Sequence, residues 1–131
     1  MLRTDDKQIV AAGAAIYATN CASCHGAGLK GQSDWQSPGA DGLMPAPPHD
    51  ETGHTWHHPD EVLFAITKHG IVKAAGLTEY RSAMPIYEGV LSDEEIVAAL
   101  SWIKAQWPAE IRERHDQMNA QYQAQKRVSN K

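Results

Sequence analysis

The 131-residue chain lacks several features that identify common classes of protein. No run of about 18 apolar residues occurs, so the sequence predicts no membrane-spanning segment. No stretch alternates as a strand does, and no internal repeat is found. The formal net charge of −4 argues against sequence-independent binding of nucleic acid. Only 7% of the residues are aromatic, although 42% are hydrophobic, so the chain can form a core and a cofactor could supply further apolar bulk.

The patterns that are present are helical. Apolar residues spaced three and four apart, together with end signals, predict an all-α protein with helices over residues 5–18, 59–69, 91–107 and about 109–125. The third is the clearest, because Ser92 and Glu95 form a capping box and Ile96, Ala99, Leu100 and Ile103 form an apolar stripe. Pro108 separates the last two helices. We therefore expect a main domain over residues 1–107 and a helical extension over 108–131.

Two long segments, residues 26–55 and 71–91, are predicted to be loops. The first contains six glycines and four prolines. A coil of this length is uncommon inside a compact domain unless it is functional or wraps a ligand. A bound cofactor would account for it.

Both cysteines lie in the stretch "NCASCHG", residues 20–26. A Cys-x-x-Cys pair can serve as a redox disulfide, as half of a zinc site, or in covalent attachment of haem. A structural zinc site usually needs a second ligand pair, and a thioredoxin-like site needs a βαβ pattern, and the chain shows neither. The histidine directly after the second cysteine is typical of c-type haem attachment. The pattern thus favours haem c, with Cys21 and Cys24 as the attachment sites and His25 as an axial ligand of the iron.

An electron-transfer haem iron usually has a second axial ligand, and methionine is a common one. Met84 lies in "SAMP", directly before the capped helix, and Pro85 stiffens that loop. Met44 is the weaker candidate, because it lies only 19 residues after His25. We therefore expect Met84 to be the second ligand, while core packing is the ordinary role of a methionine.

Over about residues 7–107 the sequence resembles the class I c-type cytochromes of the small bacterial monohaem type. The resemblance rests on "VAAGAAIY" before "CASCHG", the Met-Pro loop, and "LSDEEIVAALSWIK". It implies a cytochrome c fold, in which helices near the two ends cross at Gly13 with Trp102 close by. It also implies one haem in a loop-rich pocket with an exposed edge.

The same resemblance implies a proline carbonyl that accepts the Nδ1–H of His25, with Pro45 or Pro47 as the candidate. Such a bond fixes the orientation and basicity of a ligating imidazole. It further implies that Trp56 bonds to a haem propionate, although the match around this residue is loose.

The stretch "HDETGHTWHH", residues 49–58, departs from that family pattern. It contains four histidines, two carboxylates and Trp56: His49, Asp50, Glu51, His54, Trp56, His57 and His58. A polar loop near the propionates is the main interpretation. The alternatives are a second metal site, for which imidazole and carboxylate suit copper or zinc, and a histidine that replaces Met84 at the iron.

The sequence therefore predicts a soluble single-electron carrier, not an enzyme, that shuttles electrons between redox proteins docked transiently at the haem edge. The alternatives are a haem enzyme or a gas or peroxide sensor with a labile Met84, and a metal-binding module built on residues 49–58. Haem c is attached outside the cytoplasm in this family, so we expect a periplasmic protein. "IVAAGAA" does not look like a signal sequence, because Asp5 and Asp6 precede it where basic residues belong.

Overall fold

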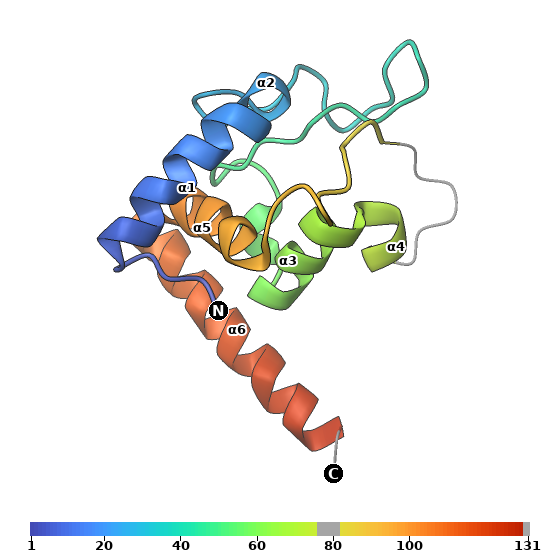
Figure 1. The fold of residues 1–131 in the computed structure, drawn as a ribbon. Helices are drawn as coiled ribbons and strands as arrows, with labels where there is room; N and C mark the ends of the chain where they lie inside the picture. Colours follow the sequence, from blue (N-terminus) through green and yellow to red (C-terminus); the bar gives the residue numbers. More distant parts are fainter. Residues whose placement is uncertain (76–81, 130–131) are drawn as a thin grey trace.

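The computed structural model describes residues 1–75 and 82–129, and within these ranges the fold is helical (Figure 1). Two isolated bridges, Met44 with Ser82 and Glu88 with Leu91, are the only strand-like pairings there. The elements are α1 (Lys7–Asn20), α2 (Ala22–His25), the 3-10 helix η1 (Thr55–His57), α3 (Asp60–His69), α4 (Ile71–Ala75), α5 (Asp93–Ala105) and α6 (Ala109–Ser129). The all-α prediction is confirmed. None of the helices in the described ranges is both long and apolar enough to cross a bilayer.

Helices α1 and α5 pack against each other and cross (Figure 1). A β-carbon placed on Gly13 would lie 1.9 Å from the carbonyl oxygen of Ala98 and 2.9 Å from Cβ of Trp102. One turn further along α1, the rings of Tyr17 and Trp102 pack with centroids 4.7 Å apart. The predicted crossing of the two helices near Gly13 and Trp102 is therefore confirmed.

The core forms around α5, whose predicted apolar stripe is fully buried. Ile96, Ala99, Leu100 and Ile103 are all less than 10% exposed. Burying each of the three larger side chains contributes about 1.5–3 kcal/mol relative to leaving it in water. Tyr17 from α1 belongs to the same cluster. The α1–α5 pair is thus the frame on which the loops are held.

Both helices begin at residues whose side chains satisfy free backbone N–H groups. The Asp6 carboxylate accepts from the backbone of Gln8 and Ile9 at 3.1 Å each. Ser92 and Glu95 form the predicted reciprocal box, with the Ser92 hydroxyl accepting from the Glu95 N–H at 3.1 Å and the Glu95 carboxylate from the Ser92 N–H at 2.9 Å. The capping box prediction is confirmed.

Replacing Ser92 with alanine is expected to lower the free energy of unfolding by about 1 kcal/mol, because the Glu95 N–H then loses its partner. Urea denaturation followed by circular dichroism measures this change. Ser33→Ala is the matched control, since Ser33 is exposed in a turn, and it should change the free energy by less than about 0.5 kcal/mol. Equal effects of the two substitutions would contradict the role of the box.

Two short helices fall where the sequence predicted none. The expected loop over residues 71–91 begins with the five-residue helix α4, and its residues 76–81 lie outside the part of the chain that the structure describes. Helix α2 is also unpredicted. The boundary predicted at Gly70 is confirmed, because Gly70 ends α3 with a φ of +89°. The last helix continues to Ser129, four residues past the predicted end.

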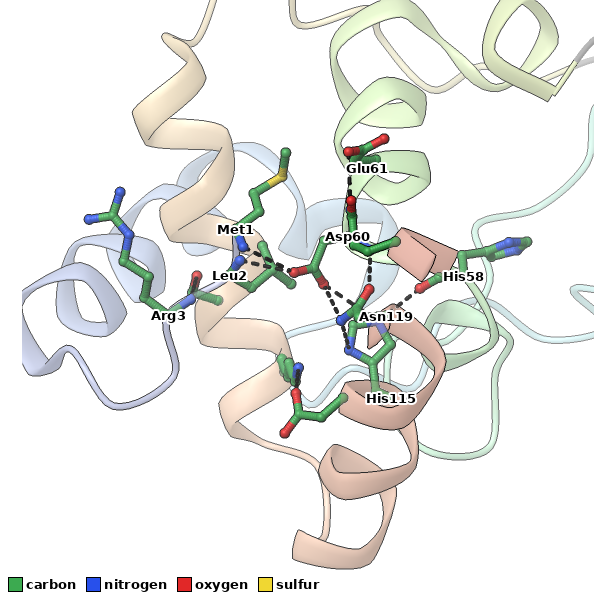
Figure 2. Close-up of polar contacts among 12 residues, drawn as sticks. Met1, Leu2, Arg3, His58, Asp60, Glu61, His115 and Asn119 are labelled. Atoms are coloured by element: carbon green, nitrogen blue, oxygen red, sulfur yellow. Dashed lines mark hydrogen bonds and ion pairs between the residues drawn. The ribbon is translucent and has the colours of Figure 1, made fainter. Parts of the chain in front are cut away.

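Helix α6 joins the rest of the fold through a small polar cluster at the start of α3 (Figure 2). The Asp60 N–H donates to Asn119 Oδ1 at 2.8 Å, and Asn119 Nδ2 donates back to the Asp60 carboxylate at 3.0 Å. His115 is fully buried and its Nε2–H donates to the His58 carbonyl at 2.8 Å. This face of α6 therefore lies on the domain, and near the end of the helix Gln123 and Lys126 bond to the Glu61 carboxylate of α3 at 3.2 Å and 2.8 Å.

The buried His115 should make stability depend on pH. Burial, followed by the nearby Lys104 ammonium, lowers the pKa of His115 below its ordinary 6.5, and the bond to the His58 carbonyl, followed by the Asp60 and Asp116 carboxylates, only partly opposes this. As the pH falls, His115 therefore takes up a proton in the unfolded chain before it does so in the folded protein. The free energy of unfolding then decreases below about pH 6.5.

We expect the free energy of unfolding to fall between about pH 7.5 and pH 5.5, and to fall less in His115→Gln, whose amide can still donate to the His58 carbonyl. Urea titrations at both pH values measure this difference. Ser33→Ala, which removes no titratable group from an exposed turn, is the control and should keep the wild-type pH dependence. An unchanged dependence in His115→Gln would contradict the assignment.

Candidate functional site

The "CASCH" segment is folded into one turn of helix at the end of α1. The Cys21 N–H donates to the Tyr17 carbonyl at 2.8 Å, so Cys21 ends α1 and begins α2. Gly26, with a φ of +89°, ends α2, and the Gly31 N–H then donates to the His25 carbonyl at 2.7 Å. This turn holds Cys21, Cys24 and His25 together on one short, well-bonded segment.

The two cysteines are free thiols with different surroundings. Cys21 is half-buried and packs against the core, whereas Cys24 is exposed. Burial, followed by the neighbouring Cys24, raises the pKa of Cys21 to about 11. Redox-active Cys-x-x-Cys pairs instead have a thiol with a lowered pKa. The surroundings of Cys21 therefore argue against the redox-pair alternative.

His25 has the surroundings of a fixed, neutral imidazole. Its side chain is 6% exposed, and its Nδ1–H donates to the carbonyl oxygen of Pro47 at 2.8 Å. Burial lowers the pKa of His25 below 6.5, while the bond to Pro47 partly opposes the shift. The neutral form is the one that binds metals, and a bonded Nδ1 leaves Nε2 as the coordinating nitrogen.

The sequence left Pro45 and Pro47 open as the supporting residue, and in the structure the acceptor is the carbonyl of Pro47 and not that of Pro45. The loop reaches His25 because Gly31 lets it approach: a β-carbon on Gly31 would lie 2.5 Å from the Pro48 nitrogen. Gln32 also pairs with Ala46, through its backbone N–H at 2.9 Å and its side chain at 2.7 Å. These contacts position the Pro47 carbonyl at the Nδ1 edge of the His25 ring.

Met84 is half-buried and packs against the same core cluster as Cys21. Its N–H donates to the Ser82 hydroxyl at 3.1 Å, and Ser82 pairs with Met44 in an isolated bridge. The two candidate methionines therefore lie on adjacent segments. The ligand role of Met84 stays a prediction.

The His-rich stretch makes a stack of aromatic rings. Trp56 stacks on His57 with centroids 3.9 Å apart, and His57 meets His54 edge to face at 5.5 Å. The Trp56 Nε1–H donates to the Glu51 carbonyl at 3.0 Å. Within residues 1–75 and 82–129, no three or more His, Cys, Asp or Glu side chains gather closely enough to hold a metal ion. The second-metal alternative thus gains no support, and the contact of Trp56 with a propionate stays a prediction.

His49, the first residue of this stretch, lies against His25 and not beside the other histidines of the stretch. The ring of His49 packs against the ring of His25, with centroids 4.0 Å apart and planes inclined by 32°. Burial, followed by the neighbouring His25, lowers the pKa of His49 to about 3. Sequence reasoning grouped His49 with the surface histidines. Its position two residues after Pro47 is the only signal that could have indicated this contact.

Comparison with known protein families finds a match. The family model described as cytochrome c oxidase, cbb3-type, subunit III matches residues 8–103. This range begins in α1 and ends in α5, so it includes the crossing helices, the cysteine pair, His25 and Met84. No curated protein and no solved structure matches the chain significantly.

Proposed function

The chain belongs to the family described as cytochrome c oxidase, cbb3-type, subunit III, which is a family of c-type cytochrome domains, and we propose that it is a single-electron carrier with His25 and Met84 as axial ligands. Members of this class carry covalently bound haem c, and one haem is typical of a domain of this size. The family indicates electron transfer. When bound, haem supplies an iron that alternates between Fe(II) and Fe(III).

The residues of this chain fit such a group. Thioether attachment requires thiols, and Cys21 and Cys24 are the only two in the sequence. Both are free, and they lie on the same helical turn as His25. The observation that carries the proposal is the state of His25, which is buried, neutral and bonded through Nδ1 to Pro47, so that Nε2 remains for the iron.

Each residue then has a separate role. Cys21 and Cys24 anchor the ring, and His25 is oriented by the Pro47 carbonyl. Met84 supplies a thioether, which raises the reduction potential relative to a nitrogen ligand. His25 and Met84 would together occupy the protein-ligand positions of the iron and leave none for a substrate, so the proposed role is transfer and not catalysis.

We also propose the division into a haem domain, residues 1–107, and an extension, residues 108–131. α6 begins directly after Pro108 and packs beside η1.

The family description names an oxidase subunit. We propose that the electron donor and the electron acceptor are other redox proteins. These would dock transiently at the haem edge over a small interface. Domains of this class are typically extracytoplasmic, and we propose the periplasm.

The proposed attachment is tested by expressing the chain with a c-type haem maturation system and measuring its mass after denaturation. We expect the mass of the polypeptide plus one haem, and a tryptic peptide containing residues 20–26 that carries it. Cys21→Ala and Cys24→Ala should each leave a single thioether, and the double variant none. A wild-type protein that loses its haem on denaturation would contradict the attachment.

A further inference from the structure

A second histidine ring lies directly against the ring of His25. The centroids of the His25 and His49 rings are 4.0 Å apart and their planes are inclined by 32°, which is a close, tilted ring contact. Pro47 bonds the edge of the His25 ring, so the ring is constrained in its plane by Pro47 and on its face by His49.

His49 is itself held at three points. Its N–H donates to the Leu29 carbonyl at 2.9 Å, and its carbonyl accepts from the Trp107 indole N–H at 2.7 Å. Its ring Nδ1 lies 2.7 Å from the hydroxyl of Thr55. Leu29, Thr55 and Trp107 are each 7% exposed or less. The backbone of His49 is therefore fixed at both its N–H and its carbonyl, and the ring cannot rotate away without breaking its bond to the Thr55 hydroxyl.

This geometry distinguishes His49 from an axial ligand. Two imidazoles that coordinate one metal from opposite sides are separated by two metal–nitrogen bonds of about 2 Å each, plus the distance from each nitrogen to its ring centre. Centroids 4.0 Å apart are too close for that arrangement. His49 therefore packs on His25 itself, and it does not take the place of Met84.

We propose that His49 is a positioning residue, whose imidazole holds the orientation of the His25 ring; Thr55 fixes that imidazole, and Trp107 fixes the backbone that carries it. This inference rests on the proposed role of His25. It also connects the ligand to the end of α5 and the start of α6, because Trp107 lies between Ala105 and Ala109 and meets His115 edge to face at 5.2 Å.

The test uses proton NMR of the haem-loaded protein, with two readouts. One is the rate at which the His25 Nδ1–H exchanges with solvent, and the other is the pattern of haem methyl shifts, which depends on the orientation of the axial imidazole. In His49→Ala we expect the exchange to be faster, on the order of tenfold, because the ring opens more often, and we expect a changed shift pattern. His49→Phe keeps a flat ring and should restore both toward wild type.

Two further variants make the result specific. Thr55→Val removes the Nδ1 partner and keeps the His49 ring, so it should raise the exchange rate less than His49→Ala, and it serves as the test if His49→Ala does not fold. His54→Ala, at an exposed position, should match wild type. The proposal would be overturned if His49→Ala kept the wild-type exchange rate and haem methyl shifts. If His49→Ala does not fold, the same result in Thr55→Val would overturn it. So would a His49→Phe variant no closer to wild type than the alanine variant. A wild-type protein without attached haem would instead overturn the proposed function.

Discussion

Replacing Gly13 with alanine is expected to lower the free energy of unfolding by at least about 2 kcal/mol. The new methyl group would lie 1.9 Å from the Ala98 carbonyl oxygen and 2.5 Å from the carbonyl carbon. Both atoms belong to the backbone of α5 and cannot turn aside. The helices would have to separate, and the packing of Tyr17 on Trp102 would loosen. Alanine favours the helix by about 1 kcal/mol relative to glycine, which offsets only part of this loss.

Gly28→Ala is the matched control for Gly13→Ala. A β-carbon on Gly28 would meet nothing within 4 Å, and its backbone is not in the left-handed region. Its free energy of unfolding should stay within about 0.5 kcal/mol of wild type. Urea denaturation of the haem-loaded protein measures both variants. If Gly13→Ala were as stable as Gly28→Ala, the close crossing of α1 and α5 would be wrong.

Replacing Met84 with alanine is expected to change the iron site more than any other single substitution outside "CASCH". Alanine cannot coordinate, so the iron would lose the ligand proposed for Met84 and would gain a site for water or carbon monoxide. Because methionine ligation raises the haem potential, the midpoint should fall by about 0.1–0.3 V, a substantial part of the roughly 0.8 V that axial ligands span. The charge-transfer band of methionine-ligated Fe(III) should also disappear.

Met44→Ala is the control, because Met44 lies beside Ser82 in the segment that pairs with the Met84 loop. It should keep the charge-transfer band and the midpoint potential of wild type. Optical spectra and carbon monoxide titrations compare the two variants. If Met44→Ala lost the band and Met84→Ala kept it, Met44 would be the ligand.

The frame of the fold could be predicted from sequence because its signals are local. The Ser92–Glu95 box and the stripe from Ile96 to Ile103 act within a few residues of each other, and both are present in the structure. Helices α2 and α4 could not be predicted in this way. They contain four and five residues, and about one turn is too short to show a helical period.

The candidate site was predictable to a similar extent. The pattern Cys-x-x-Cys-His indicates its chemistry from spacing alone, and the family match over residues 8–103 agrees with the haem that it implies. The acceptor for His25 was not predictable, because Pro45 and Pro47 are both in reach and tertiary contacts of Gly31 and Gln32 decide between them. The contact of His49 with His25 also depends on a distant residue, Trp107, which no local pattern reveals.

An optically followed redox titration of the haem-loaded wild-type protein tests the central claim most directly. A carrier ligated by His25 and Met84 should show one reversible transition with a one-electron slope, about 59 mV per tenfold change in the ratio of oxidised to reduced protein. It should remain low-spin in both states and resist carbon monoxide. A high-spin spectrum with rapid binding of carbon monoxide would contradict the account and favour an enzyme or a gas sensor.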